Sequence, residues 1–416
     1  MPTTSFSRLG SANTYDNTLR NLAARQSSLS NLQEQLTSGK KVVSASDDPT
    51  GAGQSERALM RISRIAADQR ALENQRNSIV LAESTLGDAT SAMQTFRELV
   101  VSAGNGSNGS AERQAIAIQL SGLRDQIFGF ANRKDTNGMP LFAALGSALS
   151  PFVGPSATPQ DYTYQGLPGQ TASTQTAIAS TLDGESAFMH QTSRDGVYNV
   201  SISPAASTLR TTGVTVSDSL AVTESAYTLS FSAVDSTTVP GTTTVTYDIA
   251  ENPAVSGPLS SVTVSFPTGQ SSSIQVSAVP GLSFSISGKP NVGDSVTLQP
   301  SPSIFSVLDN AIRDIGNAPN NPQASQAISQ ALHNLDIGME RISAVRGQAG
   351  DLLTRAERIN TNQEARSVQL QADRSRAEDL DMAAGISAFQ NQQTGYQAAL
   401  QSYAQVQKLS LFNFIG

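Results

Sequence analysis

Apolar residues near the amino terminus repeat every seven residues, at Tyr15, Leu22, Leu29 and Leu36. A second set of positions lies four residues after the first three of these, and it is occupied by Leu19, Gln26 and Gln33. This heptad predicts a coiled-coil helix with a narrow apolar seam. A glutamine at a seam position costs stability, but it can hydrogen-bond a partner and fix the register. The pattern stops at Gly39, where we expect the helix to end.

A second and longer heptad follows. Its apolar positions are Ala58, Ile65, Leu72, Ile79, Leu86, Met93 and Val100, with Ala82, Ala89 and Phe96 three residues after members of that series. We predict a helix over about 55–102, with Asp48-Pro49 as the N-cap and first-turn residues. Gly104, Gly106 and Gly109 mark its end, and a shorter helix is expected over 111–132.

The carboxy-terminal part, from about residue 304, mirrors this pattern. One sevenfold series is Ile328, Leu335, Ile342, Ala349 and Ala356. A polar stretch over 360–376 then separates this series from a last helix. Its seam positions alternate in spacings of four and three: Met382, Ile386, Phe389, Gln393, Tyr396, Leu400, Tyr403 and Gln407. As in the first helix, glutamines occupy seam positions.

The narrow seams of the two end helices raise the question of what they pack against. The simplest interpretation of an amphipathic helix is an intramolecular bundle. However, both end helices lie at the extreme termini and both have glutamines in the seam, which suits a tube built from many copies. We therefore predict a subunit interface, which we call the terminal seam. It comprises Tyr15, Leu19, Leu22, Gln26, Leu29, Gln33, Leu36, Met382, Ile386, Phe389, Gln393, Tyr396, Leu400, Tyr403 and Gln407.

The middle of the chain has a period of two instead. Ser and Thr supply 50 of the 160 residues from 141 to 300. Strands are predicted at Tyr198–Ser203, Ala226–Val234, Thr243–Ile249, Ser261–Pro267, Ser273–Ala278, Leu282–Ser287 and Ser295–Leu298, separated by turn residues. The fold class is thus mainly α with an inserted outer β domain. Because this domain interrupts a helical one, we expect the two termini to run back alongside each other as a long antiparallel helical bundle or coiled coil. We place a terminal coiled-coil domain at 1–44 and 374–416, a helical bundle at 45–140 and 304–373, and an outer β domain at 141–303.

Composition and charge narrow the possible functions. The chain of 416 residues contains no Cys, which excludes disulfides, thiolate zinc sites and a cysteine nucleophile. The net charge of -7 comes entirely from residues 141–300, which carry three basic and ten acidic side chains. The sequence shows no stripe of basic residues that could track a phosphate backbone, so we expect no nucleic-acid binding. Neither a signal peptide pattern nor an apolar run of membrane-spanning length is visible, so we expect any export to use another route.

The candidate chemistry is sparse. His190 and His333 are far apart in sequence, and we expect both to be solvent-facing or in loops rather than metal ligands. The glycine-rich residues 104–109 follow a helix instead of a strand, so they lack the context of a dinucleotide site. Ser38-Gly39-Lys40-Lys41 matches Ser-x-x-Lys without a supporting constellation. We predict no catalytic residue, no cofactor, no metal site and no enzymatic activity.

One segment resembles a known family. Residues 36–52 read LTSGKKVVSASDDPTGA, which is similar to the amino-terminal signature of the flagellin family, including its glycine and Ser-Asp-Asp-Pro landmarks. Residues 377–383 (AEDLDMA) resemble the family's acidic segment before the last helix. Further motifs are similar to those of subunits at the hook–filament junction rather than of filament subunits; they lie at 137–143, 164–166, 184–188, 288–296 and 409–415. The chain departs from the family pattern at Met139-Pro140 and at Phe414.

The resemblance implies a layered subunit of the flagellum. In it, the terminal helices pair around a central channel and are largely disordered before assembly, the long helices form a second layer, and the β domain faces outward. It further implies secretion by flagellar type III export, with a location outside the cell at the hook–filament junction. The implied partners are further copies of itself, hook-associated protein 1, flagellin and a flagellar export chaperone.

Three other functions fit parts of the pattern. A filament-forming flagellin would share both helical flanks. A secreted β-domain enzyme on a helical stalk, acting on glycans, would need a carboxylate or serine constellation that we do not find in 141–303. An adhesin-like binding module would be compatible with the acidic middle.

Overall fold

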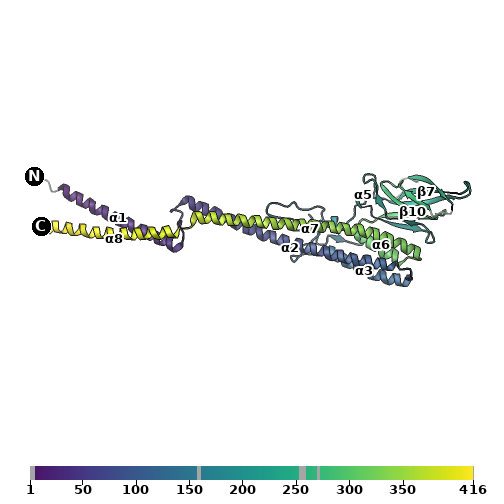
Figure 1. Ribbon diagram of the computed structural model, residues 1–416, viewed down its shortest axis with the longest axis horizontal. Helices are drawn as coiled ribbons and strands as arrows, with labels where there is room; N and C mark the ends of the chain where they lie inside the picture. Colours follow the sequence, from purple (N-terminus) through teal and green to yellow (C-terminus); the bar gives the residue numbers. More distant parts are fainter. Residues whose placement is uncertain (1–4, 157–160, 253–258, 269–271, 416) are drawn as a thin grey trace. The chain divides into compact units, whose positions relative to one another are not determined.

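The computed structural model describes residues 5–156, 161–252, 259–268 and 272–415. Its helices are α1 (Ser5–Ser38), α2 (Pro49–Ala103), α3 (Ser110–Ala131), α4 (Gly184–Phe188), α5 (Thr192–Asp195), α6 (Ile304–Gly316), α7 (Asn321–Glu378) and α8 (Met382–Ile415). Its strands are β1 (Phe152–Val153), β2 (Thr163–Tyr164), β3 (Tyr198–Ser203), β4 (Arg210–Thr211), β5 (Thr215–Val216), β6 (Ala226–Asp235), β7 (Thr242–Asn252), β8 (Ser260–Pro267), β9 (Ser272–Val276), β10 (Leu282–Gly288) and β11 (Ser295–Pro300). The chain is thus mainly helical with an inserted β domain, which confirms the predicted fold class (Figure 1).

The chain divides into two compact units. The first comprises residues 1–70 and 360–416, and the second comprises residues 71–359. Helices α2 and α7 contribute a part to each. The predicted domain boundaries divide the chain differently, and they stay a prediction. Within the described residues, no helix carries an apolar stretch long enough to cross a bilayer.

The core of the second unit is built from the predicted heptad stripes. Leu86, Met93 and Val100 of α2 have no exposed surface, and neither have Leu335 and Ile342 of α7. Helix α3 packs against α6 beside them. The sevenfold spacing places these side chains on one face of each helix, and their burial supplies the main stabilising free energy of the bundle.

Residues 141–156 and 161–197 contribute side chains that pack on this helical core. Phe142, Phe152, Tyr162 and Phe188 are buried in the same cluster as the helix side chains. Phe305 of α6 lies 5.1 to 5.8 Å, between ring centroids, from the rings of Tyr162, Phe152 and Phe188. Only residues from Tyr198 onward join the separate core of the β domain. Alternation of polar and apolar residues predicts strands, but it does not predict whether a loop packs on the helical core or on the core of the β domain.

Two antiparallel sheets enclose that second core. The larger has the order β3-β11-β6-β7-β8, and the smaller has β4-β10-β5 with β9 also pairing with β10. Each of the seven predicted strands is present, with ends shifted by at most a few residues. The strands that the sequence did not predict, β1, β2, β4 and β5, are two residues long and therefore too short to show alternation.

The structure also shows what the polar stretch and the histidines do. The stretch 360–376 is helical, because α7 runs unbroken through it to Glu378. Its Gln, Ala, Arg and Glu residues are good helix formers, and Gln363 and Leu370 continue the buried face of the helix with exposed fractions of 6% and 8%. The expectation that both histidines are solvent-facing or in loops is wrong for His333, which lies within α7 and is half-buried. It is confirmed for His190, which lies in a loop, although its side chain is buried. Burial lowers its pKa to about 4, so the ring is neutral at pH 7.

Candidate assembly interface

Helices α1 and α8 pack side by side within the first unit (Figure 1). The close approaches pair Tyr15 with Tyr403, Arg25 with Gly395 and Leu36 with Gly385. As the residue number increases along α1, the number of the partner residue on α8 decreases, so the two helices are antiparallel. The two tyrosine rings lie 5.7 Å apart between centroids, and their hydroxyl oxygens are 2.9 Å apart. The structure therefore brings the two halves of the terminal seam together on one helix pair.

The terminal seam stays largely accessible on this pair. The exposed fractions are 41% for Tyr15 and Leu19, 46% for Met382 and Ile386, and 42% for Leu400. The partly buried members are Leu22, Leu29, Leu36, Phe389, Tyr396 and Tyr403, and the four glutamines are exposed. Because these side chains are exposed in the single chain, apolar surface remains available for another subunit. That such a subunit covers it stays a prediction.

The glutamines of the seam do not show the expected cross-helix bonds among the described contacts. Gln407 donates from Nε2 to the Tyr403 hydroxyl of its own helix at 3.4 Å. Gln26, Gln33 and Gln393 have exposed side chains. Their role in setting the register between subunits therefore stays a prediction.

The segment that follows α1 is hydrogen-bonded to the segment between α7 and α8. We call this junction the clasp and define it as residues 39–41 and 378–380. The Lys41 amide donates to the Glu378 carbonyl at 2.9 Å, and the Leu380 amide donates to the Gly39 carbonyl at 2.9 Å. Gly39 has φ +71°, a left-handed conformation in which a side chain would be strained. The glycine of the signature thus ends α1 and turns the chain into the clasp.

Glu378 is the charged centre of the clasp. Its carboxylate forms an ion pair with Lys40 and accepts hydrogen bonds from Ser55 Oγ at 2.7 Å and from Arg374 Nε at 2.9 Å. The hydrogen bond from Lys40 is the main cause that lowers the pKa of Glu378 to about 2. One buried carboxylate therefore ties the end of α1 to α2 and α7. The sequence marked Glu378 only as part of a family motif, because a partner more than 300 residues away leaves no local pattern.

Aspartates cap the helices around the clasp. Asp48 Oδ1 accepts from the Gly51 amide at 2.9 Å at the start of α2, and Asp381 Oδ1 accepts from the Ala383 amide at 3.0 Å at the start of α8. Asp47 accepts from the Ser44 amide at 2.8 Å, and this bond is the main cause that lowers its pKa. The Ser-Asp-Asp-Pro motif is thus a turn and a helix start, as its cap chemistry predicted. A catalytic role is not needed to explain it.

Among the residues that the structure describes, no three His, Asp or Glu side chains lie close enough to hold a metal ion. His333 lies against the β domain, where its Nε2 is 3.1 Å from the Val214 carbonyl oxygen. The described residues of this interface therefore contribute apolar helix packing, helix capping by aspartates and the ion pair between Lys40 and Glu378.

Comparison with family models agrees with this geometry. The bacterial flagellin N-terminal helical region matches residues 11–146, and the bacterial flagellin C-terminal helical region matches residues 332–415. Together these matches cover more than half of the chain and include both sides of the clasp.

Individual relatives and structures are also similar. Flagellar hook-associated protein 3 of Salmonella typhimurium is 33% identical over 147 residues, which are 35% of this chain and 46% of that protein. The crystal structure of flagellar hook-associated protein 3 from Legionella pneumophila has a TM-score of 0.61 at 22% identity and covers 76% of this chain and 97% of its own. Xanthomonas campestris FlgL has a TM-score of 0.56 at 23% identity and covers 77% and 99%. The aligned part thus spans about half the length of the curated relative, while the fold is shared more widely.

Proposed function

Since this chain belongs to the flagellin family, we propose that it is a hook-associated protein 3, the structural subunit on which the filament is assembled at the end of the hook. The observation that carries this proposal is the antiparallel α1–α8 pair with its half-exposed terminal seam. The similarity to hook-associated protein 3 over 147 residues supports the junction role.

The proposed mechanism is mechanical. Copies form a short ring, and the terminal seams of neighbouring copies bury one another's apolar side chains. The clasp holds α1 and α8 in a fixed register, so that the seam is presented as one surface. Flagellin then stacks on the ring, and hook-associated protein 1 lies on the hook side of it.

We further propose a structural role without catalysis, in a subunit exported through the flagellar type III channel. In the cytoplasm, an export chaperone would cover the apolar stripe of α8, because that stripe is exposed before assembly. Outside the cell, the same stripe would be covered by other subunits.

Deletion of the gene tests this function. We expect cells with intact hooks, no filaments and flagellin shed into the medium, as seen by electron microscopy and immunoblotting. The full chain should restore filaments, whereas the chain lacking 382–416 should not. Restored motility with the truncated chain would contradict the role of the terminal seam.

The alternative is a filament-forming flagellin, which the two matching flagellin regions favour equally. Purified chain added to filament seeds distinguishes the two roles. A junction subunit should add in limited number and then stop, whereas a flagellin should grow long filaments.

A further inference from the structure

Helix α7 presents a polar face to the β domain. Gln326, Gln330, His333 and Asn334 are spaced by four, three and one residues, which puts them on one side of the helix. Gln330 and Asn334 are each only 3% exposed, although amide groups are rarely buried without bonds. The apolar heptad of the same helix, including Leu335, faces the helical core instead.

These side chains bond to the main chain of the β domain. The Tyr198 carbonyl of β3 accepts from Gln330 Nε2 at 3.0 Å and from Asn334 Nδ2 at 2.9 Å. Gln326 accepts from the Thr211 amide at 3.0 Å and donates to the Thr211 hydroxyl. Main-chain groups on two different strands are therefore held by one helix face.

His333 makes a third contact between α7 and the β domain. His333 Nε2 lies 3.1 Å from the Val214 carbonyl oxygen, and since a carbonyl oxygen only accepts, Nε2–H is the donor. A Cβ on Gly213 would lie 2.5 Å from the His333 ring. The backbone at Gly213 thus lies against the imidazole, where a larger residue would push the two apart.

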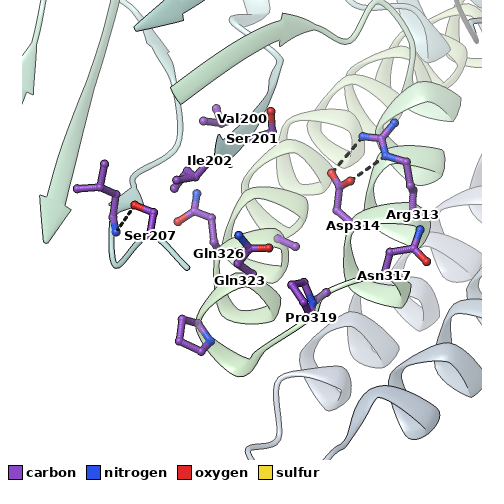
Figure 2. A pocket seen from close by; sticks show the side chains of 14 residues that line it. Val200, Ser201, Ile202, Ser207, Arg313, Asp314, Asn317, Pro319, Gln323 and Gln326 are labelled. Atoms are coloured by element: carbon purple, nitrogen blue, oxygen red, sulfur yellow. Dashed lines mark hydrogen bonds and ion pairs between the residues drawn. The ribbon is translucent and has the colours of Figure 1, made fainter. Parts of the chain in front are cut away.

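In the part of the chain that the structure describes, the buried apolar side chains form two separate clusters, one in the helical bundle and one in the β domain. The core of the helical bundle includes Val197 and Ile304, and the core of the β domain runs from Tyr198 to Leu298. The chain crosses between them only near 197–198 and 299–303. Beside the polar face lies a cleft of about 320 Å³, with Val200, Ser201 and Ile202 of β3 across from Gln323 and Gln326 of α7 (Figure 2). Apolar burial therefore leaves the orientation of the β domain weakly determined on this side.

We propose that Gln326, Gln330, His333 and Asn334 form a docking clamp that fixes the orientation of the β domain on the helical bundle. Hydrogen bonds to main-chain groups are directional, whereas apolar contacts permit sliding. The clamp would hold the outer domain at one angle, and its loss would let the domain pivot into the neighbouring cleft without unfolding either core.

Distance measurements between two spin labels test the clamp in the full chain. Because the chain contains no Cys, the substitutions Ile118→Cys on α3 and Ser230→Cys on β6 give two unique labelling sites, both exposed. The intact protein should give one narrow distance distribution. The variant Gln330→Ala/Asn334→Ala should broaden it about twofold or more, since both bonds to Tyr198 are lost.

The matched control is Gln323→Ala, which lies on the same helix beside the cleft and should leave the width unchanged. Circular dichroism checks that each variant is folded. If the double variant does not fold, the decision rests on Gln326→Ala, for which we expect a smaller broadening. An unchanged width in a folded clamp variant, or an equally broad distribution in the intact protein, would overturn the proposal.

Discussion

At the residue scale, the clasp gives the flagellin signature a physical explanation. Gly39 turns the chain, Lys40 pairs with Glu378, and the aspartates at 48 and 381 start the next helices. Each residue type is required by one contact or one backbone angle. The motif is therefore a device for joining two distant parts of the chain.

Substitution of Gly39 by Ala should weaken the clasp. The position has φ +71° and nothing within 4 Å of a Cβ, so the cost is backbone strain alone, about 1 kcal/mol. We expect the amides of Lys41 and Leu380 to exchange hydrogen about fivefold faster, as measured by mass spectrometry. Gly53→Ala, a helical glycine with only ordinary contact to Arg57, is the control and should not speed exchange.

Glu378→Gln should weaken the clasp in a pH-dependent way. The pKa of Glu378 is lowered from 4.5 to about 2, so its carboxylate stabilises the folded state above pH 4.5 and loses this effect as the pH falls towards 2. Lys40 is 45% exposed, so we expect a screened contribution of about 1 kcal/mol at pH 7.

The protection factors of the Lys41 and Leu380 amides at pH 7 and pH 3 measure this effect. The difference between the intact protein and the variant should shrink at the lower pH. Glu56→Gln makes the same charge change at an exposed position of α2 and should have little effect. A difference that is equally large at both pH values would argue against the ionic explanation.

At the scale of elements, the α1–α8 pair is the part whose stability depends most on a partner. A single pair of helices buries too little apolar surface for independent stability, since most helix stability in proteins comes from packing. Helices α2 and α7 instead bury complete stripes in the second unit.

Leu400→Asp should abolish filament attachment, because it places a charge in the terminal seam. Leu400 is already 42% exposed in the single chain, so we expect the effect on monomer folding to be small. Gln401→Asp introduces the same charge one position away from the seam and should leave motility intact. Soft-agar swimming and electron microscopy of complemented deletion strains compare the two. Normal motility with Leu400→Asp would contradict the seam.

At the scale of the whole molecule, the two units should differ in dynamics. In dilute monomer, we expect the helices over 8–36 and 382–408 to exchange their amide hydrogens rapidly. The segment 79–100 of α2, with side chains that have no exposed surface at Ile79, Leu86 and Met93, should stay protected as an internal control. Exchange-protected terminal helices in the monomer would show that they need no neighbouring subunit.

The sequence by itself determined the elements. Heptads predicted the long helices, alternation predicted each strand longer than two residues, and cap chemistry predicted the ends at Gly39 and Asp48-Pro49. These are local properties, because side chains at fixed spacing share a face whatever they later contact.

Only the tertiary structure decided which distant residues meet. It set which residues of α1 lie beside which residues of α8, placed Glu378 against Lys40 and Ser55, and buried His190 and the amides of α7. A polar residue looks the same in sequence whether water or a main-chain carbonyl satisfies it. The identity of its partner depends on chain segments more than a hundred residues away, and folding alone brings them together.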